Sequence, residues 1–196
     1  MLVFYKEIMR TCDDVISLEY LRLAYLTAAE QSTDPSTQNG VVLVSQLCEE
    51  WANEINDNGQ LEYNKKKPFR EFITSANFFP RGVQESEERW TRPLKYKFVE
   101  HAERNVIYLA ARQGFKTEGA IMYAPWFACA DCARAIIQAG VSEVIGHDYP
   151  PHKEQTSWKE SIEIADKMLQ EAGVKFSRIP GHFGIKIRFN GQVVEV

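Results

Sequence analysis

The sequence predicts a three-layer α/β/α domain, in which helices cover both faces of a central sheet that is partly parallel. One observation is the alternation of short apolar runs with amphipathic segments across the second half of the chain. That alternation is typical of β-α-β units, whose helices return the chain over the sheet so that successive strands run parallel. The other is the length of 196 residues, which fits one domain, residues 1–196, with a sizeable core.

The first half begins with a helix and a buried strand. A helix is expected over residues 17–31, because apolar side chains such as Leu21 and Tyr25 recur there at helical spacing. The run Asp-Pro-Ser-Thr at 34–37 ends that helix as a turn. Residues 40–44 are apolar and mostly β-branched, which predicts a buried strand.

The middle of the chain has a weaker pattern. Residues 69–75 are expected to form a second strand that pairs with the first, which makes segment 47–70 an enlarged hairpin connection. The three lysines at 65–67 predict a solvated loop within that segment. Residues 83–98 are polar and mixed, and Pro93 rules out one long helix there.

The second half is more regular. Helices are expected over residues 101–113, 129–139 and 158–172. Each ends one residue before a glycine, the residue that most readily takes the left-handed conformation found after a helix C-terminus. Strands are expected over residues 120–123, 141–145 and 174–179. A final hairpin is predicted at 185–194, where alternating residues meet the turn Asn190-Gly191.

Charge and apolar content argue against two classes of protein. The formal net charge is -4 and the pI is near 5.7, whereas a non-specific nucleic-acid binder normally carries a basic face. No apolar run approaches the roughly 20 residues of a membrane-spanning helix, and no secretion signal opens the chain. We therefore expect a cytoplasmic protein, whose close-spaced cysteines bind metal more often than they form disulfides.

A metal site is the strongest chemical signal in the sequence. Cys129 and Cys132 are separated by two residues, a spacing that lets both sulfurs reach one ion. His101 adds a nitrogen ligand, and both segments open a predicted helix, whose positive end favours the thiolate form of cysteine. Three nitrogen and sulfur ligands with one open position are typical of a catalytic Zn²⁺ site.

Glu103 follows His101 by two residues, which places its carboxylate within reach of the open coordination position. In zinc deaminases a His-x-Glu pattern precedes a Cys-x-x-Cys pattern, and the glutamate acts as acid and base without binding the metal. We therefore predict that Glu103 is catalytic and that His101, Cys129 and Cys132 are the metal ligands.

With these residues the chain resembles the deoxycytidylate (dCMP) deaminase family of the cytidine deaminase-like superfamily. The resemblance covers roughly residues 17–180, with a gap at 47–70, and its most similar runs are residues 34–38, the loop of Asn77, 101–105 and 129–141. One departure is Ala128, where the family has a proline directly before the first cysteine. Because that proline is not a ligand, we expect a small change in loop stiffness and no loss of metal.

The resemblance implies a cytidine deaminase-like fold with a mixed five-stranded sheet, and a homo-oligomeric zinc enzyme that converts dCMP to dUMP and ammonia. It also implies that Asn77 contacts the sugar and that Tyr149, in the loop after strand 141–145, reads the nucleotide. The phosphate of such a substrate needs a cationic or hydroxyl partner. The candidates are Arg81, Arg112, His147 and Tyr149.

Three functions remain open from the sequence. The first is a deaminase of free dCMP, or of dCMP substituted at C5 of the ring. The second is a polynucleotide deaminase acting on adenosine in transfer RNA or on cytosine in DNA, against which the acidity of the chain argues. The third is a non-catalytic zinc-stabilised binding protein, which would have no need of Glu103 and would close the fourth metal position with another ligand.

Overall fold

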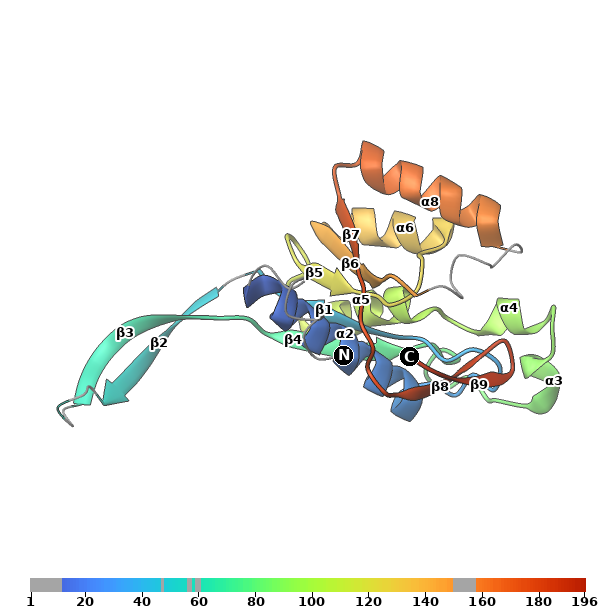
Figure 1. Cartoon of the computed structure of the whole chain (residues 1–196), viewed down its shortest axis with the longest axis horizontal. Helices are drawn as coiled ribbons and strands as arrows, with labels where there is room; N and C mark the ends of the chain where they lie inside the picture. The colour runs from blue at the N-terminus through green and yellow to red at the C-terminus, as the bar shows by residue number, and fades with distance from the viewer. Residues whose placement is uncertain (1–11, 47, 56–57, 59–60, 150–157) are drawn as a thin grey trace.

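The computed structural model describes residues 12–46, 48–55, 58, 61–149 and 158–196 (Figure 1). Its centre is a five-stranded sheet with the order β4-β1-β5-β6-β7. The strands are β1 (Gly40–Val44), β4 (Phe72–Ala76), β5 (Ile121–Tyr123), β6 (Glu143–His147) and β7 (Lys175–Ile179). Because β1 runs antiparallel to β4 and β5 while β5, β6 and β7 run parallel, the mixed five-stranded sheet is confirmed.

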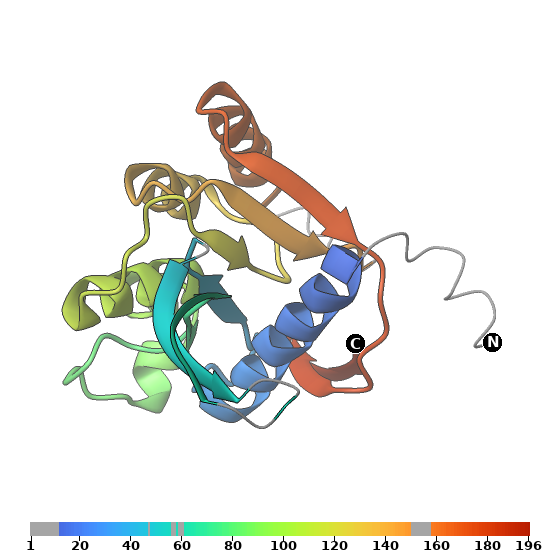
Figure 2. The same cartoon turned by 90° about the vertical axis from the view of Figure 1, so that its left-hand side faces the viewer.

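Helices cover both faces of this sheet (Figure 2). One face carries α2 (Cys12–Gln31), and the other carries α5 (Ala102–Gln113), α6 (Ala130–Gln138) and α8 (Lys159–Glu171). Along β1, Val42 and Val44 pack with Leu21 of α2, whereas Val41 and Leu43 belong to the core beneath α5 and α6. This strand is apolar at every position because both of its faces are covered.

The predicted C-terminal hairpin packs against α2 and against Trp126, which follows β5. It consists of β8 (Lys186–Phe189) and β9 (Gln192–Glu195), and its turn residues Asn190 and Gly191 both have positive φ. Ile187 and Phe189 point inward and pack with Tyr25 of α2. Alternation along β8 therefore arises because only one face of the hairpin is covered.

Segment 47–70 is where the structure departs from expectation. It is indeed the connection between the paired strands β1 and β4, but it forms a hairpin of its own, β2 (Cys48–Ile55) with β3 (Leu61–Phe69). This arm extends away from the sheet in Figure 1. The solvated loop predicted for the lysines at 65–67 is wrong, since they pair with residues 50–52 across the arm. The two strands of this arm pair with each other and project from the sheet, so no core selects apolar residues at alternate positions. Their sequence therefore lacks the apolar alternation by which a core strand is recognised.

Helix ends follow the sequence more closely. Gly114, Gly140 and Gly173 have φ values of 70°, 73° and 74°, which confirms the three predicted stops. Around Pro93 the chain forms two short helices, α3 (Glu87–Trp90) and α4 (Lys95–Phe98), in place of one long one. Among the described residues, none of the helices combines the length and the hydropathy needed to cross a membrane.

The direction of the strands decides where the site lies. β4 and β5 both pair antiparallel with β1, so they run parallel to each other and end at the same edge of the sheet. α6 follows β5 directly, and α5 begins beside the end of β4, where Glu100 bridges Phe78 and Asn105 Nδ2 donates to the Ala76 carbonyl oxygen. Both helices therefore begin at that edge. β6, parallel to β5, ends there too. In open α/β sheets the crevice outside the carboxyl ends of the strands is the usual ligand site.

Close contact between α2 and β1 depends on Gly40. A Cβ atom at this position would overlap the Ala24 carbonyl oxygen and lie 2.5 Å from the Ala28 backbone nitrogen. Both neighbours are backbone atoms of a packed helix, which cannot move without separating the helix from the sheet.

We therefore predict that Gly40→Ala destabilises the protein by about 3 kcal/mol, the upper range for overpacking a well-filled core. Urea denaturation followed by circular dichroism measures the change. The control is Gly146→Ala, also in a central strand, where the nearest atom to an added Cβ is 3.4 Å away and the expected cost is below about 1 kcal/mol. Equal stability of the two variants would contradict the packing argument.

Candidate active site

Two helix starts bring three metal-ligand residues together at this edge of the sheet. His101 immediately precedes α5 and Cys129 immediately precedes α6, while Cys132 lies in the first turn of α6. Their ligand atoms all lie within 4.8 Å of one another. The two sulfurs are 3.5 Å apart, and His101 Nδ1 lies 3.6 Å from Cys129 Sγ and 3.4 Å from Cys132 Sγ.

These separations fit a tetrahedral zinc site. With Zn–S bonds of about 2.3 Å and a Zn–N bond of about 2.1 Å, tetrahedral angles place two sulfurs about 3.8 Å apart and a sulfur and a nitrogen about 3.6 Å apart. The observed distances differ from these by about 0.3 Å or less. Within the described part of the chain no fourth protein ligand joins the group, which suits a metal that keeps one position open.

The two cysteines behave as a coupled pair. The hydrogen bond between their sulfurs is the largest influence on both; it lowers the pKa of Cys129 to about 3 and raises the pKa of Cys132 well above its usual value. Burial raises both pKa values, and hydrogen bonding to His101 further lowers that of Cys129. The pair therefore holds one thiolate readily, and a divalent cation supplies the charge that stabilises the second.

Arg104 places a positive charge beside these sulfurs. Its Nη1 lies 3.9 Å from Cys132 Sγ, and its guanidinium pairs with Glu100, whose carboxylate also accepts a 3.0 Å hydrogen bond from the His101 backbone N–H. Burial lowers the pKa of Arg104, but the negative charge of Cys132 and the contact with Glu100 outweigh it and raise that pKa. The Glu100–Arg104 pair thus connects the histidine segment to the cysteine segment.

Glu103 lies in the first turn of α5 with 2% of its surface exposed. Burial is the main cause that raises the pKa of its carboxyl group, against the lowering effect of His101. Asn39 Nδ2 donates a long hydrogen bond of 3.5 Å to Glu103 Oε2. A buried carboxyl group with a raised pKa is better able to hold and return a proton than one in water, as a general acid and base must.

A pocket opens above this group. His101, Glu103 and Cys129 form part of its wall, and aromatic and apolar side chains form much of the rest. These side chains are Tyr96, Val99, Trp126, Phe127, Trp158 and Ile162. They come from the segments that follow β4, β5 and β6, so the pocket occupies the crevice that the sheet topology predicts.

A buried polar network holds one wall of the pocket. Asp34 accepts the backbone N–H groups of Ser36 and Thr37 and forms an ion pair with Lys95, at 2.6 Å. Asn77 Nδ2 donates to Asp34 Oδ2 and to the Thr37 carbonyl oxygen. Its Oδ1 accepts from Ser32 Oγ and the Asn39 N–H. All four hydrogen-bonding positions of the Asn77 amide are therefore used within the protein.

Asn77 and Tyr149, the predicted substrate contacts, occupy different surroundings. Asn77 lines the pocket, although its amide is committed to the network above. Tyr149 is outside the described lining of the pocket; its ring stacks on His147 with centroids 5.5 Å apart, and its hydroxyl donates to the Glu195 carbonyl oxygen. Contact of either residue with a nucleotide stays a prediction.

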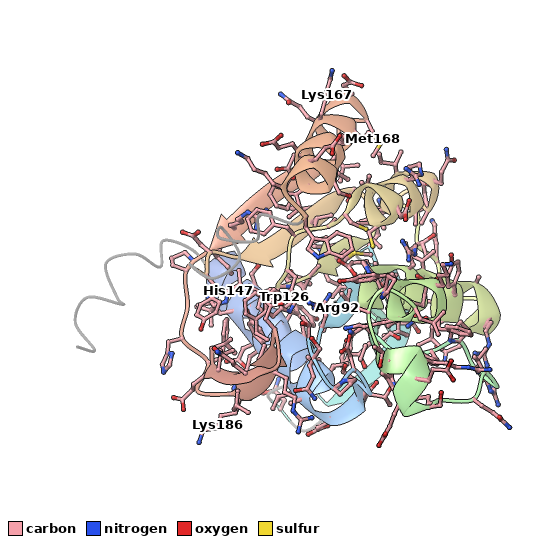
Figure 3. All side chains as sticks on the ribbon, turned by 90° about the vertical axis from the view of Figure 1, so that its right-hand side faces the viewer. Arg92, Trp126, His147, Lys167, Met168 and Lys186 are labelled. Atoms are coloured by element: carbon pink, nitrogen blue, oxygen red, sulfur yellow. The ribbon has the colours of Figure 1, made fainter. Side chains whose placement is uncertain are left out.

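The other residues proposed for the phosphate also lie outside that lining, which contains neither Arg81 nor Arg112. His147 is 1% exposed, its Nδ1 lies 2.7 Å from the Tyr25 hydroxyl, and its Nε2 lies 3.2 Å from the Gly181 carbonyl oxygen. Burial lowers its pKa, which favours the neutral form of a histidine whose two ring nitrogens both contact groups within the protein. Figure 3 shows it in the same view as Trp126 and Arg92.

Sequence reasoning missed several residues of the pocket, namely Asn39, Arg92, Tyr96, Trp126 and Trp158. Two of them had a signal in the sequence, because Trp126 follows a predicted strand and Trp158 opens a predicted helix. Arg92 and Tyr96 lie in a polar stretch without periodicity, so only the folded chain places them in the same pocket as His101.

Comparison with known proteins agrees with this geometry. A family model described as "Cytidine and deoxycytidylate deaminase zinc-binding region" matches residues 16–147. An uncharacterized deaminase from the luxG 3′ region of Aliivibrio fischeri is 32% identical over 154 residues, which cover 76% of this chain and 84% of that protein. Deoxycytidylate deaminase of Mus musculus is 28% identical over 169 residues, 82% of each chain.

The fold has a counterpart among solved structures. It resembles dCMP deaminase from the cyanophage S-TIM5, solved in complex with dCMP and dUMP, with a TM-score of 0.53 and 20% identity over 87% of this chain and 100% of that one. This confirms the cytidine deaminase-like fold. With a family match over more than half of its length and a ligand group of the expected kind, the chain belongs to the zinc-binding cytidine and deoxycytidylate deaminase family, a family of hydrolytic enzymes.

Proposed function

We propose that this protein is a zinc-dependent enzyme that hydrolyses dCMP to dUMP and ammonia. One observation carries the proposal: the buried carboxyl group of Glu103 lies in the wall of the same pocket as the His101–Cys129–Cys132 group. A binding protein with a structural zinc would have no use for a buried proton carrier at that place. Several curated relatives are named deoxycytidylate deaminases, which supports dCMP as the substrate.

His101, Cys129 and Cys132 hold the metal in this proposal, which when bound supplies Lewis-acid activation of a water molecule. Glu103 takes up a proton from the water that attacks C4 of the cytosine ring. It delivers that proton to N3 and then helps to protonate the departing amine. Over the whole reaction one water is consumed, one carbonyl group forms at C4 and one ammonia is released. Glu103 ends in the protonation state in which it began.

The rest of the pocket suits a planar base joined to a sugar. Trp126, Phe127 and Trp158 offer aromatic surface to a base, whose ring stacks favourably on such side chains. Asn77 lines the pocket, and by the resemblance we propose that it contacts the sugar. Tyr149, two residues after the end of β6, is proposed by the resemblance to contact the nucleotide.

Glu103→Gln keeps the shape of the side chain but removes its ability to carry a proton. We expect ammonia release from dCMP to fall by at least about 100-fold, the usual contribution of a general acid and base. Zinc content, measured by mass spectrometry, should stay at the parent level. Glu163→Gln, whose side chain is 66% exposed on α8, serves as the control with parent activity. Release of ammonia by Glu103→Gln at the parent rate would rule out the mechanism.

Replacement of a sulfur ligand tests the metal assignment separately. We expect Cys132→Ser to lower the zinc content of the purified protein well below one ion per chain, because a neutral hydroxyl is a poor replacement for a thiolate ligand. Treatment of the parent with a chelator should abolish activity, and added Zn²⁺ should restore it. Cys12→Ser is the matched control, and an equal zinc content in the two variants would contradict the assignment.

A panel of substrates tests the base and the phosphate. We expect the highest kcat/KM for dCMP among cytidine, CMP, dCMP, 5-methyl-dCMP, 5-hydroxymethyl-dCMP, dCTP and dAMP, with ammonia release as the readout. A preference for a 5-substituted nucleotide would change the assigned substrate but keep the protein a deaminase of free deoxycytidine nucleotides. Activity on transfer RNA or single-stranded DNA alone would replace it with a polynucleotide deaminase.

We also propose that residues 1–196 form one catalytic domain that works as a cytoplasmic homo-oligomer. Cys129 and Cys132 are not joined by a disulfide, which suits a reducing compartment. Light scattering coupled to size-exclusion chromatography measures the oligomeric state.

A further inference from the structure

A nucleotide substrate brings a phosphate that the metal group does not accommodate. The inference below rests on the proposed function and concerns how this phosphate is bound. A phosphate dianion is recognised by charged donors, and arginine is favoured because its guanidinium can donate two parallel hydrogen bonds. The described lining of the pocket offers two such cations, Lys95 and Arg92.

Lys95 is already committed to the protein. Its side chain is 5% exposed, and its Nζ lies 2.8 Å from Asp34 Oδ1 and 2.6 Å from Asp34 Oδ2. The positive charge is therefore neutralised, and the same Asp34 is bound to Asn77. A phosphate could take Lys95 only by breaking a buried ion pair, which costs several kcal/mol.

Arg92, unlike Lys95, is not committed to an ion pair with a described residue. Its side chain is exposed, and among the described residues it has no ion pair. Its contacts are a 3.4 Å hydrogen bond from Nη2 to Ser36 Oγ and a position 5.9 Å above the centre of the Tyr96 ring. Most of its five N–H donors thus remain available. Figure 3 labels Arg92 and Trp126, which both line the pocket.

The rim beside Arg92 is held in place by backbone contacts. Gly191 N–H donates to the Ser36 carbonyl oxygen at 2.8 Å, and Asn190 N–H donates to Thr37 Oγ1 at 3.2 Å. These contacts attach the β8–β9 turn to the loop that Arg92 touches. Asn190 and Thr37 also line the pocket, so the rim presents a polar edge next to the guanidinium.

We propose that Arg92 binds the 5′-phosphate of the substrate and thereby makes the enzyme select nucleotides over nucleosides. The base lies toward Glu103 and the metal ligands, and the phosphate lies at the rim, where Arg92 supplies a charge that no described acidic side chain neutralises. Arg81 and Arg112, the arginines considered from the sequence alone, have no place in the described lining of the pocket.

The test compares ligands that differ only in the phosphate. For Arg92→Gln we expect kcat/KM with dCMP to fall by about 10-fold to 100-fold, the usual effect of losing a charge-assisted hydrogen bond. The inhibition constant of the product dUMP should rise by a similar factor, while that of deoxyuridine should change by less than about twofold. Arg92→Lys should recover part of the loss, since lysine keeps the charge without the fork of donors.

Arg89→Gln is the matched control. Arg89 is a nearby exposed arginine that donates to the Gln84 carbonyl oxygen, lies over the Phe98 ring and is absent from the described lining of the pocket. We expect it to leave both inhibition constants at the parent values. Equal weakening of dUMP and deoxyuridine by Arg92→Gln would show a general effect on the pocket, and no weakening of either would place the phosphate elsewhere; both results overturn the proposal.

Failure of the proposed function would look different. In that case the parent enzyme would release no ammonia from dCMP, whatever residue stands at position 92. Calorimetric titration with dCMP and deoxycytidine would then still decide whether Arg92 binds a phosphate, because binding needs no turnover. Loss of dCMP binding in Arg92→Gln with unchanged deoxycytidine binding supports the assignment, and equal binding by parent and variant overturns it.

Discussion

The three ligand atoms lie within 4.8 Å of one another because two helices begin at one edge of one sheet. His101 ends the segment that follows β4, and Cys129 ends the segment that follows β5. These strands run parallel because both pair antiparallel with β1 between them. Reversal of either strand would send its helix start to the far edge of the sheet. The position of β1 in the sheet is therefore a condition for the metal site as well as for the core.

Several charged and ionisable groups lie at this edge of the sheet, and burial shifts their pKa values. Helix starts and Arg104 stabilise negative sulfur, and burial raises the pKa of Glu103. A carboxyl group in water would be ionised and would carry its charge permanently at neutral pH. Here burial raises the pKa of the Glu103 carboxyl group, while the pKa of the neighbouring Cys129 is lowered to about 3. Glu103 and Cys129, two acidic groups beside the same histidine, thus have pKa values shifted in opposite directions by their surroundings.

Rigidity at the pocket comes from polar groups that are satisfied within the protein. Asp34, Lys95 and Asn77 bind one another and hold the loop that leads into β1, although none of them lies in a regular strand. Lys95 and Arg92, two cationic residues of the same pocket wall, differ in role because their tertiary contacts differ. One is neutralised and structural, and the other is left exposed at the rim with capacity for an anion.

Much of the fold could be read from local pattern. The strand over residues 40–44, the helix stops at Gly114, Gly140 and Gly173, and the turn at Asn190-Gly191 all follow from residue types that restrict the backbone locally. The β2–β3 arm escaped prediction because it faces no core and so carries no apolar alternation. Tyr149, Arg81 and Arg112 were selected as substrate contacts by residue type and loop position, which say nothing about distance.

The sequence by itself determined the ligand types, their spacing and the proton carrier beside them, because these require particular side chains at short separations along the chain. It determined the family for the same reason. Only the tertiary structure decided which of its cations reaches the pocket and which amide is already fully bonded. Those outcomes depend on contacts between segments up to about 150 residues apart, such as Arg188 with Gln38, and no local pattern encodes such a contact.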